Sequence, residues 1–419
     1  MDVFELCGRL YAVLLLCQCL LQRLVHSKDE SCKYKLEPLW TASLRDSPLA
    51  ATPTFFDVDG DGYGDIVAPS FSGEVWSVHG ESGHIVDNWP FYLEERAFHS
   101  SPLVYDVNKD GVLEFLLATS DGEIVFLHTN NSLLHGETIK IAPLKVRREW
   151  YKLDKEYIDK IAHELGKQLG DSERLRIGAG NEGGRENRPP AADKGPSNLH
   201  QHSEAFSEFE SRYGLHADPL YSRHQREKFL LGLSPGDVHN VFVEPHILAT
   251  PTLADTNGDG NFNELVVPVS YYFDPFYYGD PHNLGKLGGL DSGELVHFVA
   301  GGVVVIDLSI GAVVGQKVLG LTEATDSQPA YMLSSPTVVR MFPDVGGAVI
   351  ITATATGEVN MLEAESLESV SGFPVRLDSV SASVAVADLF KDGVLELVVG
   401  DNSGNIYCID SRGKRRWEF

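Results

Sequence analysis

Asp57-Val-Asp-Gly-Asp-Gly-Tyr-Gly-Asp65 is the stretch on which the interpretation of the chain depends, because its carboxylates occupy relative positions 1, 3, 5 and 9. A calcium ion takes about six to eight oxygen ligands, and a tight loop whose alternate side chains turn inward supplies most of them. We therefore expect calcium to be held by the acidic side chains and by the backbone carbonyl of the seventh position: Asp57, Asp59, Asp61, Tyr63 and Asp65.

Short apolar segments flank this loop, Ala51-Thr-Pro-Thr-Phe-Phe before it and Ile66-Val-Ala after it. Such segments are typical of strands. An EF-hand would instead need helices on both sides and a Glu at its twelfth position, which here is Ala68. The loop is therefore predicted to connect two strands.

The same spacing of acidic residues recurs along the chain. The second copy, after Ser101-Pro, offers Asp106, Asn108, Asp110, Val112 and Glu114. The third, after Thr250-Pro, offers Asp255, Asn257, Asp259 and Asn261, and because it is one residue longer, either Asn263 or Glu264 closes it. A fourth copy keeps Asp388, Asp392 and Glu396 but has Phe390 where an oxygen is needed, so we expect a weak site or none. The segment from Ser335 to Ile351 keeps the strands and lacks the ligands.

The spacing of these copies predicts the fold. About 50 residues separate Pro53 from Pro102, and a similar number separates Pro336 from Val384. A repeat of this length with several short strands is the sign of a β-propeller. We predict an all-β propeller of about five blades, with blades 1 and 2 in residues 28–136, and with blades 3 to 5 and the start of a further blade in residues 244–419.

Residues 137–243 interrupt the repeats as a long polar insertion. Its first part includes a possible amphipathic helix, Tyr151 to Leu165, and the tract from Gly178 to Ser203 has the composition of a disordered segment. The insertion either binds a partner or is a tolerated loop, since long loops add little closure entropy.

The N-terminus predicts entry into the secretory pathway. Residues 1–27 contain a short apolar core and are expected to be a signal peptide, or else a signal-anchor. Extracellular, cell-surface or ER/Golgi locations follow, and Asn130-Asn-Ser132 is a glycosylation sequon. Cys32 and Cys408 remain after cleavage and are expected either to pair, or to leave Cys408 packed in the core.

Composition and motifs exclude some functions. The net charge of −26 and the pI near 4.9 argue against a nucleic-acid partner. The chain has no nucleophile elbow, zinc signature or phosphate loop, and lone histidines in strands are more often packed or solvated than catalytic. We therefore expect no enzyme, although a propeller enzyme using some of His79, His99, His128, His282 and His297 is an alternative.

An aromatic stretch from Ser270 to Asp291 interrupts the third repeat. It is either a recognition platform for sugar or protein, or a local cap packed over its blade. The first option gives a second alternative function, a lectin-like propeller that binds glycans through Tyr271, Tyr272 and Phe276.

Taken together, the cation loops preceded by Ser/Thr-Pro and followed by an apolar strand and a Gly turn resemble the FG-GAP (VCBS-type) repeats of integrin alpha-chain propellers. The chain more closely resembles the plant exine-formation family of such propellers. This resemblance is carried by Cys32 with Leu36 to Trp40, Trp89-Pro-Phe, His99 to Leu103, Asp121-Gly-Glu, Val146 to Trp150, Ser270 to Tyr278, Leu287 to Asp291 and Ser334 to Val339.

The resemblance implies a calcium-binding protein of the secretory pathway or cell surface that acts in patterning the pollen wall. Its expected partner is an extracellular or cell-surface protein or polysaccharide. Members of the family continue to a C-terminal membrane span, so membrane association is expected through a region missing here or through the signal-anchor.

Overall fold

The computed structural model describes residues 37–45, 47–49, 51–93, 96–134, 138–147, 216–217, 240–274, 298–324, 326–341 and 347–419. The chain divides into two units, Met1–Ser43 and Leu44–Phe419, and every strand lies in the second. The expected signal segment 1–27, Cys32, the helix from Tyr151 and the polar tract from Gly178 lie outside the described residues. The described part of the chain contains no apolar helix of a length that would span a bilayer.

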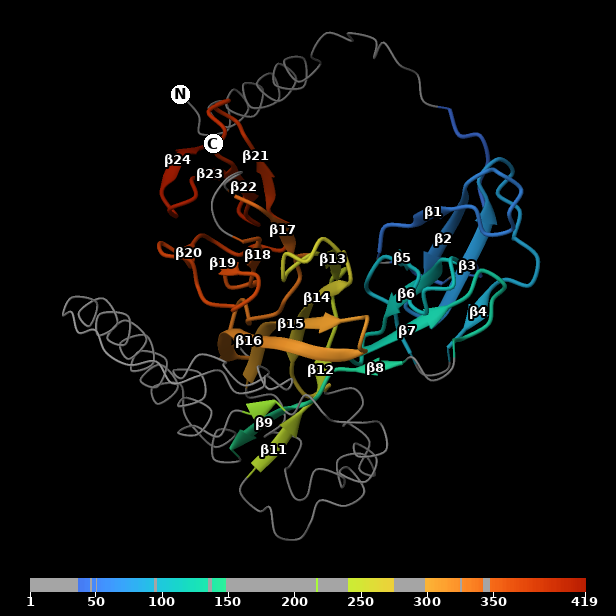
Figure 1. The fold of residues 1–419 in the computed structure, drawn as a ribbon, viewed down its shortest axis with the longest axis horizontal. Coiled ribbons are helices and arrows are strands. Elements are labelled where there is room, and N and C mark those ends of the chain that lie inside the picture. Colours follow the sequence, from blue (N-terminus) through green and yellow to red (C-terminus); the bar gives the residue numbers. More distant parts are fainter. Residues whose placement is uncertain are drawn as a thin grey trace, which may run out of the picture. The chain divides into compact units, whose positions relative to one another are not determined.

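Five antiparallel sheets follow one another along the chain, and we number them as blades 1 to 5 (Figure 1). Blade 1 consists of β1 (Thr54–Phe56), β2 (Asp65–Pro69), β3 (Glu74–His79) and β4 (Phe91–Tyr92), and blade 2 of β5 (Leu103–Tyr105), β6 (Glu114–Ala118), β7 (Glu123–Leu127) and β8 (Ile139–Lys140). Blade 4 consists of β17 (Thr337–Val339), β18 (Val349–Ala353), β19 (Glu358–Glu363) and β20 (Val375–Arg376), and blade 5 of β21 (Ala385–Ala387), β22 (Glu396–Gly400), β23 (Ile406–Ile409) and β24 (Arg415–Glu418).

Blade 3 has a divided first strand. Both β12 (Pro245–His246) and β13 (Thr252–Ala254) pair with β14 (Glu264–Tyr271), at opposite ends of it. The longer β15 (Phe298–Asp307) and β16 (Ala312–Glu323) complete this sheet. A separate small sheet joins β9 (Leu144–Arg147) to β10 (His216–Ala217) and β11 (Asn240–Val243).

Two expected boundaries need correction. The insertion was expected from residue 137, but β8 lies inside that range and pairs with β7, so it belongs to blade 2. The last residues were expected to start a further blade, but β24 pairs with β23 and is the fourth strand of blade 5. Every residue of β24 is exposed, which explains how a strand with two adjacent arginines is accommodated at this edge.

The core lies between consecutive blades, because each strand presents alternate residues to opposite faces. In blade 2, Phe115 and Leu127 pack against blade 1, whereas Leu116 and Phe126 pack against blade 3. The same alternation joins blade 3 to blade 4, and blade 4 to blade 5. Sheets of four strand positions that pack face to face in sequence define a β-propeller, so the predicted all-β propeller is confirmed.

Blade 5 presents a more exposed face on the side turned away from blade 4. Ile406 is 43% exposed there, whereas its equivalents Ile124 in blade 2 and Val359 in blade 4 are completely buried against the following blade. The buried Cys408 is paired with Val398 of the neighbouring strand β22, and Val398 is half-buried.

Threonines of the Ser/Thr-Pro-Thr phrase link neighbouring blades by hydrogen bonds. The hydroxyl groups of Thr54, Thr252 and Thr337 donate to the backbone carbonyls of Pro102, Pro336 and Val384, at 2.7, 2.6 and 2.7 Å. Each acceptor occupies the equivalent phrase of the next blade. The Ser/Thr-Pro-Thr motif that precedes the cation loops therefore also links neighbouring blades by hydrogen bonds.

Replacing Thr252 by Val should lower the free energy of unfolding by about 1 to 2 kcal/mol, because it leaves the carbonyl of Pro336 without this donor. Urea denaturation measures this. Thr352→Val is a matched control: its hydroxyl is buried without a hydrogen-bond partner, so its removal should be neutral or stabilising. Equal losses of unfolding free energy in both variants would contradict a stabilising role of the hydrogen bond from Thr252 to Pro336.

Candidate metal-binding loops

Four loops with the acidic spacing connect the first and second strands of their blades, and thus lie at the same end of each sheet. They join β1 to β2, β5 to β6, β13 to β14 and β21 to β22. We refer to them as loops 1, 2, 3 and 5, after their blades. In blade 4, residues 342–346 of the corresponding connection lie outside the described part of the chain.

The four loops share one backbone conformation. The residues at positions 4 and 6 have positive φ angles in all of them. Position 6 is always glycine, with φ between 83° at Gly393 and 89° at Gly62, a region that a side chain would disfavour. Position 4 is Gly60, Lys109, Gly258 and Lys391 in turn. Loop 5 therefore keeps this shape despite its incomplete set of oxygens.

The carboxylate at position 1 organises the bend. One oxygen of Asp57 accepts the backbone N–H of Gly62 at 3.0 Å, and Asp106 accepts that of Gly111 at 2.9 Å. Asp255 and Asp388 accept the corresponding bonds from the glycines of loops 3 and 5, at 3.1 and 3.0 Å. The carboxylate at position 5 likewise accepts the N–H of position 7, as Asp61 does from Tyr63 at 2.8 Å.

A buried carboxylate closes each loop by accepting the N–H of position 2. Asp65 accepts from Val58 at 2.9 Å, and Glu114 accepts from Val107 at 3.1 Å. In loop 3 this role belongs to Glu264, which accepts from Thr256 at 2.9 Å. Glu396 closes loop 5 by accepting from Leu389 at 3.0 Å.

The structure thus decides whether Asn263 or Glu264 closes loop 3. Glu264 reaches into the loop, and its second oxygen also accepts from Asn257 at 3.0 Å. Asn263 is turned to the next strand, where it donates to Asp307 at 3.2 Å. The extra residue in this loop shifts the closing carboxylate from position 9 to position 10.

Loop 1 brings its acidic side chains together. Ligand atoms of Asp57, Asp59 and Asp65 all lie within 4.8 Å of one another, and so do those of Asp59, Asp61 and His79. Two ligands of one calcium ion are separated by at most about 5 Å, twice the metal–oxygen distance. The side chain of Tyr63 is exposed, so this residue has only its backbone carbonyl to offer, as has the exposed Val112 in loop 2. The residues of loop 1 thus fit a hard divalent cation.

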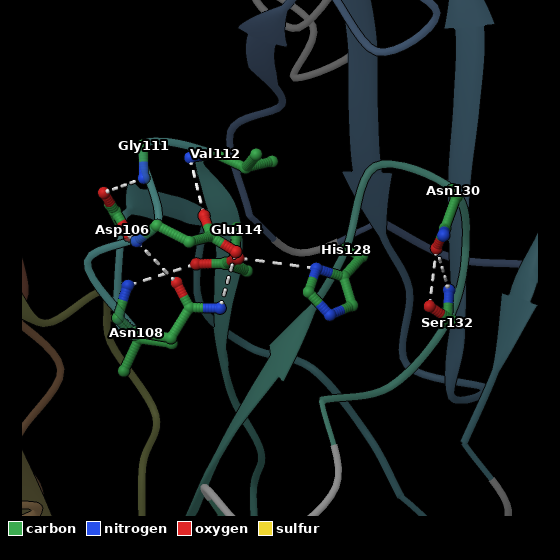
Figure 2. A network of polar contacts seen from close by, with 10 residues as sticks. Asp106, Asn108, Gly111, Val112, Glu114, His128, Asn130 and Ser132 are labelled. Carbon is green, nitrogen blue, oxygen red and sulfur yellow. Dashed lines mark hydrogen bonds and ion pairs between the residues drawn. The ribbon is translucent and has the colours of Figure 1, made fainter.

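Loop 2 contains a buried carboxylate oxygen that accepts no hydrogen bond and lies 3.4 Å from the Nδ1 atom of His128. The side chain of Glu114 is 0% exposed, and its Oε1 atom has no hydrogen-bond partner. A buried carboxylate oxygen without a donor is costly unless a charge compensates it. Figure 2 shows this carboxylate near Asp106 and Asn108, with a dashed line that joins it to His128. A cation in the loop would compensate the charge of this carboxylate.

The electrostatics of loop 3 point to the same need. Burial raises the pKa of Glu264, and the charges of Asp259, Asp307 and Asp255 raise it further, while the bond from the N–H of Thr256 lowers it. The cluster therefore disfavours its own ionised form. A bound cation reverses this penalty.

Loop 5 has fewer oxygens. Phe390 occupies position 3, is 47% exposed, and lies beneath the guanidinium of Arg416 at 5.4 Å from its ring centroid. Asp388, Asp392 and Glu396 keep their places, but nothing replaces the oxygen at position 3.

The sequence analysis named His79 and His128 only as candidates for a catalytic site and did not predict that they lie opposite the closing carboxylates. His79 is paired with Asp65 in the sheet, and its Nδ1 atom lies 3.3 Å from Asp65 and 3.7 Å from Asp59. In blade 2, the Nδ1 atom of His128 lies 3.4 Å from Glu114. Both histidines follow the glycine of the Gly-Glu turn by the same interval, which is a signal that the sequence contains.

The aromatic stretch is partly core. Tyr271 is 1% exposed, and its hydroxyl accepts a hydrogen bond from Gln316 at 2.8 Å. Phe273 is also buried, and Tyr272 stacks on His246 with 3.9 Å between centroids. Packing therefore accounts for Tyr271 and Phe273, which cannot form a surface platform. Residues from 275, with Phe276 and His282, lie outside the described part of the chain.

The remaining candidates have ordinary surroundings. His99 packs edge-on against Phe71, with centroids 4.6 Å apart, and burial lowers its pKa. Cys408 is a free, buried thiol, which agrees with the alternative of core packing. His297 and Cys32 are outside the described residues.

The sequon lies on the surface after β7. Asn130 is exposed, and its side-chain oxygen accepts both the backbone N–H of Ser132 at 3.0 Å and its hydroxyl at 2.5 Å (Figure 2). The amide nitrogen to which a sugar would be attached is therefore on an accessible turn.

No protein-family model and no curated protein sequence matches the chain. Among solved structures it is similar to BamB from Moraxella catarrhalis, with 10% identity, a TM-score of 0.39, and coverage of 90% of this chain and 62% of BamB. It is similar to BBS1N in complex with ARL6DN, with 10% identity and a TM-score of 0.42. This match covers 92% of this chain and 74% of BBS1N. It is also similar to the quinohemoprotein alcohol dehydrogenase from Comamonas testosteroni, with 10% identity and a TM-score of 0.42. This match covers 84% of this chain and 51% of the dehydrogenase.

The chain thus spans less than two thirds of the length of BamB. Similarity at this level says nothing of activity, and the fold assignment depends on the five sheets and their packing. The class defined by fold and site is an all-β propeller whose blades carry repeated acidic hairpin loops.

Proposed function

We propose that this chain is a non-enzymatic, calcium-binding FG-GAP-type propeller that acts in the secretory pathway or at the cell surface. Calcium would hold the first two strands of a blade at a fixed angle, and the stiffened blades would present a surface to an extracellular protein or polysaccharide. The observation that carries the proposal is the buried Oε1 atom of Glu114, which accepts no hydrogen bond, inside a loop whose geometry is repeated in three other blades.

The residues that would hold the ion follow from their positions. In loop 1 they are Asp57, Asp59, Asp61, Tyr63 and Asp65; in loop 2, Asp106, Asn108, Asp110, Val112 and Glu114; in loop 3, Asp255, Asn257, Asp259, Asn261 and Glu264. Tyr63, Val112 and Asn261 would contribute their backbone carbonyls. Asn263 would support loop 3 from outside, through Asp307. Bound calcium would neutralise the clustered carboxylates.

Calorimetric titration tests this proposal. We expect three calcium ions per chain, one for each of loops 1 to 3, and two after either Asp57→Ala or Asp106→Ala, because each change removes the carboxylate that organises one bend. Asp388→Ala is the matched control, since loop 5 has the same shape but lacks an oxygen at position 3. Absence of calcium binding by the unaltered chain would refute the proposal.

The proposed partner follows from the resemblance to the exine-formation family, which implies patterning of the cell wall or matrix. A lectin-like function through the aromatic stretch receives no support from the described residues, because Tyr271 and Phe273 are buried. Enzymatic use of His79 and His128 is also less favoured than a place beside the cation loops, since both face carboxylates there.

Passage through the secretory pathway should attach a glycan to Asn130, because the side chain is exposed and Ser132 completes the sequon on the same turn. Expression in a eukaryotic secretory host and treatment with an N-glycosidase should increase the electrophoretic mobility of the chain. Asn130→Gln should abolish this shift, and an unmodified Asn130 in secreted material would contradict the expectation.

A further inference from the structure

The cation loops of blades 1 and 2 differ from that of blade 3 in having an imidazole within reach. His79 ends β3 and His128 follows β7, and each lies opposite the carboxylate that closes the loop of its own blade. Figure 2 shows the ring of His128 facing Glu114 with Nδ1 turned toward it. In blade 3 the same place is taken by Asp307, opposite Glu264.

The separations suit two donors on one ion. Neighbouring ligands at right angles lie about 1.4 bond lengths apart, which is roughly 3.0 to 3.7 Å for metal–ligand bonds of about 2.1 to 2.6 Å. The Nδ1 atom of His79 is 3.3 Å from Asp65 and 3.7 Å from Asp59, and that of His128 is 3.4 Å from Glu114. His79 also joins Asp59 and Asp61 in a group whose ligand atoms all lie within 4.8 Å.

The imidazole of His128 lies at ion-pair distance from the carboxylate of Glu114 and forms no hydrogen bond with it. Glu114 is fully buried, and its Oε1 atom has no hydrogen-bond partner although Nδ1 of His128 is the nearby nitrogen. The separation of these two atoms is that of an ion pair, and it also suits two ligands of one ion.

Blade 3 provides the contrast within the chain. Asp307 accepts hydrogen bonds from the backbone N–H and hydroxyl of Ser309, at 2.8 and 2.6 Å, and from Asn263 at 3.2 Å. Its carboxylate is thus engaged outside the loop. Loop 3 offers only oxygen ligands, the type that calcium and magnesium prefer.

We propose that His79 and His128 are nitrogen ligands that convert loops 1 and 2 into mixed nitrogen–oxygen sites, which take a divalent transition-metal ion such as Mn²⁺ in competition with calcium. An imidazole nitrogen favours transition-metal ions over calcium, which binds oxygen almost exclusively, and Mn²⁺ also accepts the oxygen ligands of these loops. The inference rests on the proposed function, because it uses the same loops. Loop 3 remains a calcium site.

Electron spin echo spectroscopy with Mn²⁺ alone as the probe tests the inference on the purified chain. The unaltered chain should show coupling of the bound Mn²⁺ to an imidazole nitrogen, and the double variant His79→Gln/His128→Gln should lose it. The affinity for Mn²⁺ should fall by about tenfold or more in that variant, the lower end of the loss for altered metal surroundings. Its affinity for calcium should change by less than about twofold. His84→Gln, at an exposed position in the turn after β3, is the control.

The possible results separate the two proposals. Calcium binding together with Mn²⁺ that shows no nitrogen coupling would overturn the inference and leave the calcium proposal standing. Nitrogen coupling that survives the double variant would also overturn it. Failure of the unaltered chain to bind either ion would refute both. Thermal melting of the double variant in calcium, expected to match that of the unaltered chain, shows that the fold is kept.

Discussion

Chelation of calcium should lower the melting temperature of this chain by about 10 °C or more. A ligand that binds only the folded state stabilises it by about 2.7 kcal/mol at a concentration 100 times its dissociation constant. Three saturated loops would therefore contribute roughly 8 kcal/mol, and 1 kcal/mol corresponds to a few degrees in a domain of this order of size. Without the ion, each loop also concentrates carboxylates, as the raised pKa of Glu264 indicates.

Circular dichroism melting in calcium and in excess chelator measures this effect. Asp57→Ala and Asp106→Ala should each reproduce about a third of the loss, and calcium should no longer restore that part. Asp388→Ala in loop 5 should leave the calcium-dependent shift unchanged. Identical melting with and without chelator would contradict the structural role of the ion.

Phe115→Ala should lower the free energy of unfolding by about 3 to 5 kcal/mol, the usual cost of removing a buried aromatic side chain. Phe115 is 0% exposed and lies in β6, where it forms edge-to-face contacts with Phe56 and Trp89, at 5.3 and 6.1 Å between centroids. These contacts cross from blade 2 to blade 1. The truncation would therefore open a cavity in the interface between two blades.

Phe55→Ala is the control for this prediction, because Phe55 is 72% exposed on β1 beside Phe56. It should change the free energy of unfolding by less than about 0.5 kcal/mol. Urea denaturation of both variants in calcium separates core packing from metal binding. A loss at Phe115 no larger than that at Phe55 would mean that blades 1 and 2 do not share this core.

Much of the fold could be predicted because the decisive pattern is local. The alternation of apolar residues around Asp57 and its return after about 50 residues identify strands, hairpins and blades. The bend itself is specified within a few residues, since Gly62 permits the positive φ and Asp57 accepts its N–H. Loop 5 shows how strong this local information is, as it keeps the bend with Phe390 in place of an oxygen.

The contacts between strands and between blades could not be predicted in the same way, because they join residues that are far apart in the sequence. Of the two alternatives for Cys408, the structure favours packing in the core, because its thiol is free and buried in β23. The last residues were expected to start a further blade, but pairing with β23 makes β24 the outer strand of blade 5. Neither outcome follows from residues adjacent in the chain.

The sequence by itself determined the all-β repeat, the hairpin bends and the oxygens of each loop, because all of these depend on contacts within about ten residues. Only the tertiary structure decided that Glu264 rather than Asn263 closes loop 3, that Thr252 bonds to Pro336, and that His128 faces Glu114. Those contacts depend on strand register and on the packing of one blade against the next, which bring together residues far apart in the chain.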